Sequence, residues 1–467
     1  MDTKRIKLIL WIAIGVMVLA MVIFFLVVVL GGIKNSFEAD KPGEATEDPS
    51  FATETPGATG IPETEAPTDT PAPTEAPVTY EDVDIVTVGD VIIYYSLWQR
   101  ALQNGNGEAY DFSELTSLLT DIVEAADVAV FNFEGTCAGE NAGGYSHYPS
   151  FNAPDSIITA MKNTGFDISL FANNHCYDKG NGGFHRTQQL MKSNGLTVYG
   201  TKDTADGSSY GIYEVKGVKI GFLNYTYEYA PDDKNGDSSV KYLNGNKVDQ
   251  VDRDLIDSFN YTRLGEFYSG VSGRIAEMRS EGADFIMFVI HWGDEYQEEA
   301  NSTQKAIAQK LCDLGVNALI GMHPHVVQPV ETFVSADRSN RMICFYSLGN
   351  FISAQNRTTF ESKPSYAWLT ENEVLSKITV RKYSTGETVI ANVSYEPLWS
   401  HRLGVSGGTK TTIVPVRLAL ENDESKNRYG LNESSFGVDH ATAARDYIKS
   451  QVESGIAAYN EGIVLPH

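Results

Sequence analysis

The sequence predicts an α/β fold in which helices and strands form separate layers. From residue 82 onward, short runs rich in β-branched and aromatic residues alternate with segments of helical periodicity, and this alternation is typical of layered α/β domains. Several apolar runs also end in a residue that can bind a metal ion, as expected for a site at the carboxyl ends of strands. A long uncharged run and a proline-rich segment precede the alternating part.

The N-terminal segment predicts a membrane anchor. Residues 8–33 carry no charge and exceed the ~20 apolar residues that a membrane-spanning helix needs. Lys4, Arg5 and Lys7 precede this run, so the positive-inside rule places residues 1–7 in the cytoplasm and the globular domain outside the cell. A cleaved signal peptide is the alternative, but its apolar core is usually only ~7–15 residues long. We therefore expect an uncleaved signal anchor in the cell membrane.

Residues 34–80 predict a disordered stalk. They are rich in Pro, Thr and Glu and nearly free of large aliphatic residues, so they cannot bury enough apolar surface to offset the entropy of ordering. The chain has a net charge of −25, and removing −8 for the stalk and +2 for the first 33 residues leaves −19 on residues 81–467. Such an acidic body is a poor partner for nucleic acid. An anionic substrate would need a local positive centre such as a metal ion.

The first half of the globular part predicts three strands and three helices. Strands are expected at residues 83–90, 128–135 and 167–175, and helices at 112–126, 156–165 and 183–195, from the periodicity of the apolar residues. Two adjacent strands are expected at 210–217 and 218–229. The polar residues from 231 to 260 predict a surface excursion.

The second half continues the alternation. Helices are expected at 271–282, 303–315 and 440–462, and strands at 283–293, 316–325, 341–351, 375–383 and 388–399. We expect one domain over residues 81–400 and a C-terminal extension over 401–467 whose helix packs on that domain. The four cysteines are too few and too scattered for a disulfide framework, and the sequence leaves open whether Cys137 and Cys176 pair.

Five predicted strands end in candidate metal ligands. These residues are Asp90, Glu134, Asn174 with His175, His291, and His323 with His325. Pro324 favours an extended residue before it, so the last two imidazoles should point to the same side. Each residue alone has another interpretation, such as a helix cap, an ion pair or a hydrogen-bonded core histidine. Together they form a mixed oxygen and nitrogen set that suits Mn, Fe or Zn, and the number of ligands favours two ions with shared ligands.

With these residues identified, the sequence resembles the capsule-synthesis CapA family, which has a calcineurin-like metallophosphoesterase fold. The matching stretches are VGDV, NFEG, FANNHCYDKG, IHWGDEY, GMHPHVVQPVE and FYSLGNFI. The resemblance implies a four-layer αββα sandwich in which Asp90, Glu134, Asn174, His291, His323 and His325 are metal ligands. It also implies that His175 is the catalytic histidine and that Asp178 orients it. The sequence departs from classical phosphoesterases, because Asp90 is followed by VII instead of by a residue and a histidine.

The resemblance implies a part in capsule or poly-γ-glutamate synthesis or export, with an anionic polymer and the membrane subunits of a synthase complex as partners. A second hypothesis is an active metal-dependent phosphoesterase acting on a phosphorylated cell-envelope substrate, in which His175 protonates the leaving oxygen. A third is hydrolysis or transfer at the amide bonds of poly-γ-glutamate. The residues alone leave open whether the site turns over a substrate.

Overall fold

The computed structural model describes residues 77–229, 240–358, 365–406 and 408–465. The predicted membrane span at 8–33 and nearly all of the predicted stalk at 34–80 lie outside the described residues. Among the described helices, none combines the length and apolar character needed to cross a membrane.

The first sheet contains eight described strands in the order β17-β16-β15-β1-β2-β3-β4, with β14 beside β1. Strands β1 to β4 are parallel, because helical crossovers connect them, whereas the closely connected β15, β16 and β17 are antiparallel. The bounds are β1 (Tyr80–Val91), β2 (Val128–Phe133), β3 (Ile168–Leu170), β4 (Thr197–Tyr199), β14 (Asn350–Ile352), β15 (Asn372–Tyr383), β16 (Thr388–Val405) and β17 (Gly408–Pro415).

The second sheet has the order β12-β13-β11-β10-β6-β5, with β9 beside β6. Its central strands β6, β10, β11 and β13 are parallel. The two strands predicted to be adjacent are β5 and β6, and they pair in antiparallel orientation. The bounds are β5 (Gly211–Val215), β6 (Val218–Glu228), β9 (Ser258–Asn260), β10 (Phe285–His291), β11 (Ala318–Met322), β12 (Val330–Val334) and β13 (Arg341–Phe345).

The two sheets pack face to face and carry helices on their outer faces. One apolar cluster joins Ile85 and Val130 of the first sheet to Ile220, Met287 and Ile320 of the second. A second apolar cluster lies between the first sheet and its helices, and a third lies between the second sheet and its helices. The first sheet is covered by α2 (Tyr95–Asn104), α3 (Ser113–Thr116), α4 (Thr120–Glu124), α5 (Ser156–Asn163) and α6 (Gly180–Ser193), and the second by α7 (Leu264–Ser280) and α8 (Ser302–Asp313). The predicted α/β class is confirmed, with two mixed sheets.

Three predicted elements differ clearly from the structure. The strand predicted over 341–351 is divided into β13 of the second sheet and β14 of the first. The helix predicted over 112–126 is divided into α3 and α4, because the chain turns at residues 117–119 between them. The strand predicted over 167–175 is limited to β3, which ends at Leu170. The shorter strand leaves Asn173, Asn174 and His175 in the loop that follows it.

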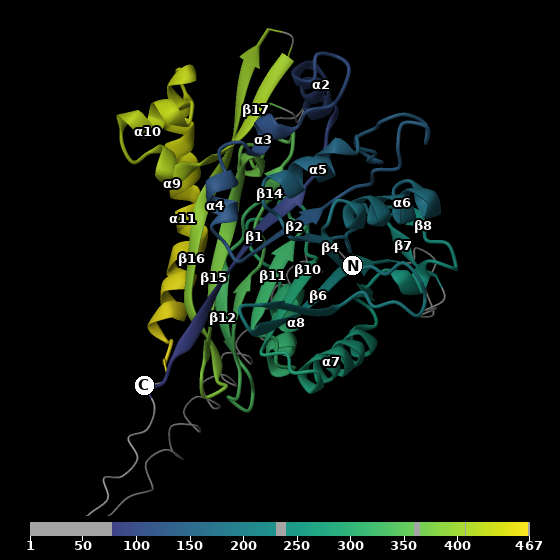
Figure 1. Cartoon of the computed structure of the whole chain (residues 1–467), viewed down its shortest axis with the longest axis vertical. Helices are drawn as coiled ribbons and strands as arrows, with labels where there is room; N and C mark the ends of the chain where they lie inside the picture. The colour runs from purple at the N-terminus through teal and green to yellow at the C-terminus, as the bar shows by residue number, and fades with distance from the viewer. Residues whose placement is uncertain (1–76, 230–239, 359–364, 407, 466–467) are drawn as a thin grey trace, which may run out of the picture. The chain divides into compact units, whose positions relative to one another are not determined.

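The C-terminal residues complete the sandwich. Strand β16 passes through residue 400, and β17 extends the same sheet. Helix α11 (Gly437–Glu461) then contacts β16 of the first sheet and β12 of the second, and Figure 1 shows it running alongside β16. Its apolar residues Tyr447, Ile448, Val452 and Ile456 join the cluster between the sheets. Shorter elements are β7 (Tyr242–Leu243), β8 (Asn246–Lys247), α9 (Val416–Ala419) and α10 (Asp423–Arg428).

Candidate metal centre

The six predicted ligands meet at one edge of the sandwich. Asp90 lies in β1, Glu134 directly follows β2, and Asn174 lies in the loop after β3. His291 ends β10, and His323 and His325 follow β11. The strands within each group are parallel, so their carboxyl ends lie side by side. Because the two sheets face each other, the carboxylates and amide of the first sheet meet the imidazoles of the second.

Glu134 lies at the centre of this cluster. Its Oε1 is 3.5 Å from Nε2 of His291, 3.9 Å from Nε2 of His325 and 3.9 Å from Nε2 of His175. The side chain is buried, and neither carboxylate oxygen has a hydrogen-bond partner among the described residues. A buried carboxylate that no donor satisfies is strongly destabilising unless a cation lies beside it.

Asp90 forms the second carboxylate position. Its Oδ2 lies 3.3 Å from Nδ1 of His325 and accepts a hydrogen bond of 3.1 Å from the backbone N–H of His323. Its Oδ1 accepts a hydrogen bond of 2.8 Å from Nδ2 of Asn132. Asn174 completes the set, since its Oδ1 lies 2.8 Å from Nε2 of His291.

Three overlapping groups have ligand atoms within 4.8 Å of one another, and they contain these side chains and the exposed Glu295, which was not predicted. They are Glu134 with His291 and His323, Asp90 with Glu134 and His325, and Glu295 with His323 and His325. Glu134, His323 and His325 each belong to two groups, so two cations could share ligands here. Carboxylate oxygen and imidazole nitrogen together fit a divalent transition metal better than Ca²⁺.

The close packing of ionisable groups in the cluster shifts the pKa values of several of its side chains. Burial and the neighbouring imidazoles lower the pKa of His323 well below its ordinary value, which keeps this ring neutral and able to bind a metal. Burial acts in the same direction on His325, but the carboxylates of Glu134 and Asp90 outweigh it and raise its pKa to about 9. Burial would raise the pKa of Asp90, whereas the hydrogen bond from His325 and the imidazole charges hold it below its ordinary value.

The backbone of the histidine pair corrects one prediction. Residues 323–325 are not an extended segment, because φ is +97° at His323 and +58° at His325. The strand ends at Met322, and the loop after it adopts a left-handed conformation that is unfavourable for residues with a side chain. The two ring centroids nevertheless lie 5.8 Å apart, so the imidazoles converge through a tight loop and not through strand periodicity.

His175 and Asp178 form a dyad beside the cluster. Nδ1 of His175 lies 2.7 Å from Oδ2 of Asp178, so its Nε2 is the nitrogen that faces Glu134. The same Oδ2 accepts a hydrogen bond of 2.7 Å from the backbone N–H of Phe151. Burial would lower the pKa of His175, but the Asp178 carboxylate outweighs burial and raises it.

The segment predicted as a surface excursion supplies a residue of the site, which corrects that prediction. Asn244 donates through Nδ2 to Oδ1 of Asp178 at 3.0 Å, and the same nitrogen lies 3.0 Å from Nδ1 of His175. Asn244 and Gly245 form the turn between β7 and β8, with φ of 45° and 77°. An Asn-Gly pair is a strong signal for such a hairpin, so this sequence feature could have predicted the turn.

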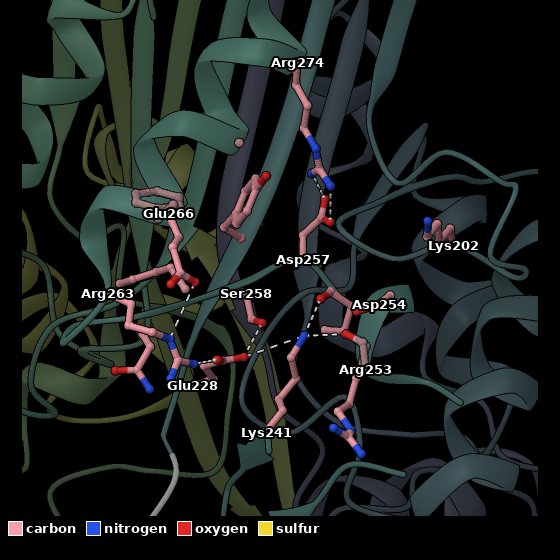
Figure 2. A pocket seen from close by; sticks show the side chains of 16 residues that line it. Lys202, Glu228, Lys241, Arg253, Asp254, Asp257, Ser258, Arg263, Glu266 and Arg274 are labelled. Atoms are coloured by element: carbon pink, nitrogen blue, oxygen red, sulfur yellow. Dashed lines mark hydrogen bonds and ion pairs between the residues drawn. The ribbon is translucent and has the colours of Figure 1, made fainter. Parts of the chain in front are cut away.

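The partly buried Lys241 anchors the same segment beside a polar cavity of about 410 Å³. Nζ of Lys241 donates to the backbone carbonyls of Arg253 and Ile256 at 2.5 and 2.8 Å, and it lies 3.6 Å from Glu228. Figure 2 shows Lys241, Arg263 and Arg274 directed toward neighbouring acceptors of this cavity. These three cations are therefore already paired with carboxylates that line the cavity.

Other residues of the site were not predicted from the sequence. Asn132 holds Asp90, and Asn173 holds the loop by donating to the backbone carbonyl of Phe133 at 2.7 Å. The ring of Tyr227 packs against that of His323, with 4.9 Å between the ring centroids. The buried carboxylate of Glu373 accepts a hydrogen bond of 2.5 Å from the backbone N–H of Gly89, the residue before Asp90. Their contacts join segments far apart in the sequence, so local patterns do not reveal them.

All four cysteines are buried and free.

The chain also resembles known proteins. A family model described as "Bacterial capsule synthesis protein PGA_cap" matches residues 84–355. The capsule biosynthesis protein CapA of Bacillus anthracis is 26% identical over 282 residues, which are 60% of this chain and 61% of that protein. The PGA biosynthesis protein CapA of Bacillus subtilis (strain 168) is 26% identical over 288 residues, which are 60% of this chain and 66% of that protein.

The alignments cover part of this chain and part of each relative. The chain covers 61% and 66% of the length of the two curated relatives. A crystal structure of a hypothetical protein from Thermus thermophilus aligns with 68% of this chain at 15% identity and a TM-score of 0.35, which is too low to establish a shared fold. The family match covers more than half of the chain and includes all eight predicted site residues. The chain belongs to the bacterial capsule synthesis protein PGA_cap family.

Proposed function

We propose that this protein takes part in the synthesis or export of a poly-γ-glutamate type of capsule and that its cluster binds divalent metal ions. Membership of the capsule synthesis family supports the first part of the proposal. The second part depends on one observation, which is that the buried Glu134 carboxylate faces three imidazoles without a hydrogen-bond donor among the described residues. A cation beside Glu134 would satisfy both of its oxygens.

The proposed fold is the calcineurin-like metallophosphoesterase sandwich. Two sheets packed face to face, with helices on the outer faces of both, support this assignment. The position of the cluster at the carboxyl ends of strands from both sheets also supports it. The three residues after Asp90 are Val91, Ile92 and Ile93, so the first strand supplies a carboxylate without a neighbouring histidine.

The proposed metal centre holds two ions of Mn, Fe or Zn type. Asp90, Glu134, Asn174, His291, His323 and His325 would hold them, with Glu134 shared between the two positions. Bound cations would supply the positive charge that an anionic group needs at the surface of a protein with a net charge of −25. His175 and Asp178 lie beside these ligands and would act on the bound group.

The proposed location is the outer face of the cell membrane. Residues 8–33 would anchor the chain, and residues 34–80 would separate the folded part from the membrane. An anionic polymer and membrane subunits of a synthase would be the partners of this arrangement.

Metal analysis of the purified full chain tests the metal centre. We expect about two divalent ions per chain and a large loss of bound metal in His323→Ala, because this imidazole belongs to two of the three ligand groups. His440→Ala is the matched control, since His440 lies outside those groups. A wild-type chain that contains no metal after purification and reconstitution would refute the metal centre.

An active phosphoesterase is the second candidate function, and the His175–Asp178 dyad favours it. Asp178 fixes His175 at Nδ1, so Nε2 is directed toward Glu134 and the cluster. In hydrolysis of a phosphodiester, water adds to phosphorus and releases one proton to solvent. The bond from phosphorus to the leaving oxygen breaks, and protonated His175 donates its Nε2 proton to that oxygen. The bound cations would supply charge stabilisation for the phosphate.

Hydrolysis of bis-p-nitrophenyl phosphate by the metal-loaded full chain tests this second candidate. We expect His175→Ala to lower turnover by about 10²-fold to 10⁴-fold while it retains the bound metal. His440→Ala should retain both. Full metal content without turnover in the wild type would contradict the phosphoesterase function and favour a polymer-binding role in capsule synthesis.

A further inference from the structure

A second cavity, of about 360 Å³, lies where strand β16 extends beyond strand β15. The pairing of the two strands ends at Asn372 and Trp399, so residues 400–405 of β16 pair only with β17 among the described strands. Trp399 and Phe436 supply aromatic walls, and Ser400 and Arg402 line the cavity from β16. None of the eight predicted site residues lines it.

In one half of this cavity, the charges of Arg357 and Glu371 cancel each other. Arg357 donates through Nε and Nη2 to the carboxylate of Glu371 at 2.9 and 2.8 Å. Its Nη1 donates to Nε2 of His440 at 2.7 Å, so this imidazole nitrogen is the acceptor. The indole N–H of Trp399 adds a hydrogen bond of 3.3 Å to Glu371. Arg357 and Glu371 therefore cancel each other's charge.

The other half presents donors that have no acceptor in the part of the chain that the structure describes. Arg402 is partly buried, and its Nη1 is a buried atom without a hydrogen-bond partner among the described residues. Ser400 is only 6% exposed, and its hydroxyl also has no partner there. Because the two residues are two positions apart on a strand, their side chains project from the same face. Burial lowers the pKa of Arg402, yet a guanidinium stays charged in proteins.

We propose that this cavity binds a ligand through a single carboxylate group, which accepts hydrogen bonds from Arg402 and Ser400. The charge balance leads to this assignment. Arg357 and Glu371 cancel, so Arg402 leaves one positive charge, which one carboxylate neutralises. A phosphate dianion would bring a second negative charge close to Glu371. The aromatic rings of Trp399 and Phe436 lie at the same cavity and would contact an apolar part of the ligand.

Titration of the full chain with small anions tests the proposal. Acetate, butyrate and inorganic phosphate are added separately, while tryptophan fluorescence and the melting temperature are followed. We expect saturable binding of both carboxylates, with butyrate tighter than acetate because its chain reaches the aromatic walls. Trp399→Phe should remove the fluorescence change without removing the shift in melting temperature.

Substitutions locate the binding. Arg402→Met should weaken carboxylate binding by about tenfold or more, because a charged hydrogen bond is lost. Ser400→Ala and Arg402→Lys should weaken it less. Arg428→Met is the matched control, since it removes a surface guanidinium that pairs with Asp121 elsewhere. The metal content should be unchanged in all of these variants, which separates this site from the proposed metal centre.

Three results would overturn the proposal. The first is the absence of saturable carboxylate binding to the wild type. The second is a carboxylate affinity of Arg402→Met equal to that of the wild type. If Arg402→Met does not fold, the same result for both Ser400→Ala and Arg402→Lys would overturn the proposal. The third is phosphate binding that is tighter than that of either carboxylate and is lost in Arg402→Met, which would assign the cavity to a different class of anion.

Discussion

At the scale of single residues, Glu134 gives the strongest reason to expect a cation. The side chain is 1% exposed, and its Oε1 lies within 3.9 Å of imidazole nitrogens of His175, His291 and His325. A carboxylate in such a place needs a cation or several donors to compensate for lost hydration. The folded state should therefore be stabilised when a divalent metal binds.

Metal-dependent stability checks this inference. At a free metal concentration of about 100 times the dissociation constant, the free energy of unfolding should rise by about 2.7 kcal/mol. Glu134→Gln should reduce this rise, because an amide is a weaker metal ligand than a carboxylate. Chemical denaturation with and without metal measures the difference.

A matched variant controls for the loss of a carboxylate. Glu331→Gln changes a glutamate that pairs with Lys305 at 2.9 Å, outside the cluster. It should show the same metal-dependent rise as the wild type. An unchanged rise in Glu134→Gln would count against a metal at this position.

At the scale of elements, helix α11 depends on a close approach to β12. A Cβ atom at Gly455 would lie 1.9 Å from the backbone oxygen of Val330, so the helix can contact the strand only without a side chain there. Helix α7 contains a glycine, Gly273, at which a side chain would fit without a clash. A Cβ atom at Gly273 would meet no other atom within 4 Å.

Two alanine substitutions should therefore have opposite effects on stability. Gly455→Ala should destabilise the protein by about 1–3 kcal/mol, because the clash moves α11 away from the sandwich. Gly273→Ala should stabilise it by about 0.5–1 kcal/mol, because alanine favours the helix. Urea denaturation measures both values. A neutral Gly455→Ala would show that α11 is not held closely on β12.

At the scale of the whole molecule, Asn224 connects the two sheets beneath the site. It lies in β6 of the second sheet and accepts a hydrogen bond of 2.8 Å from the backbone N–H of Ala172, which follows β3 of the first sheet. Ala172 lies two residues before Asn174. The position of this loop relative to His291 therefore depends on a contact between the sheets.

Asn224→Ala should lower both stability and metal content. Loss of this buried hydrogen bond should destabilise the fold by about 1–3 kcal/mol, and the loop with Asn174 should move relative to the imidazoles. Denaturation and metal analysis measure the two effects.

Asn317→Ala provides the comparison for this prediction. Asn317 also accepts a backbone hydrogen bond of 2.8 Å, from Ile286, but it lies before β11, at the end of the second sheet opposite the site. Its loss should affect stability alone. Equal metal loss in both variants would indicate that general destabilisation, and not the contact between sheets, lowers metal binding.

The sequence by itself determined the α/β class and most of the ligand candidates. Apolar periodicity identified the strands β1, β2, β10 and β11, because a buried strand needs a continuous apolar run. The polar residue at the end of each run identified Asp90, Glu134, His291 and His323. Both signals are local in the chain, so a single sequence contains them.

Only the tertiary structure decided how these residues meet. Apolar patterns do not specify which strands pair, so the division of the ligands between two facing sheets came from packing. The left-handed backbone at His323 and His325 is imposed by the loop after β11 and contradicts the extended segment expected around Pro324. The contact of Asn244 with His175 joins residues 69 positions apart. Such contacts depend on the folded arrangement of the whole chain, because no local propensity encodes them.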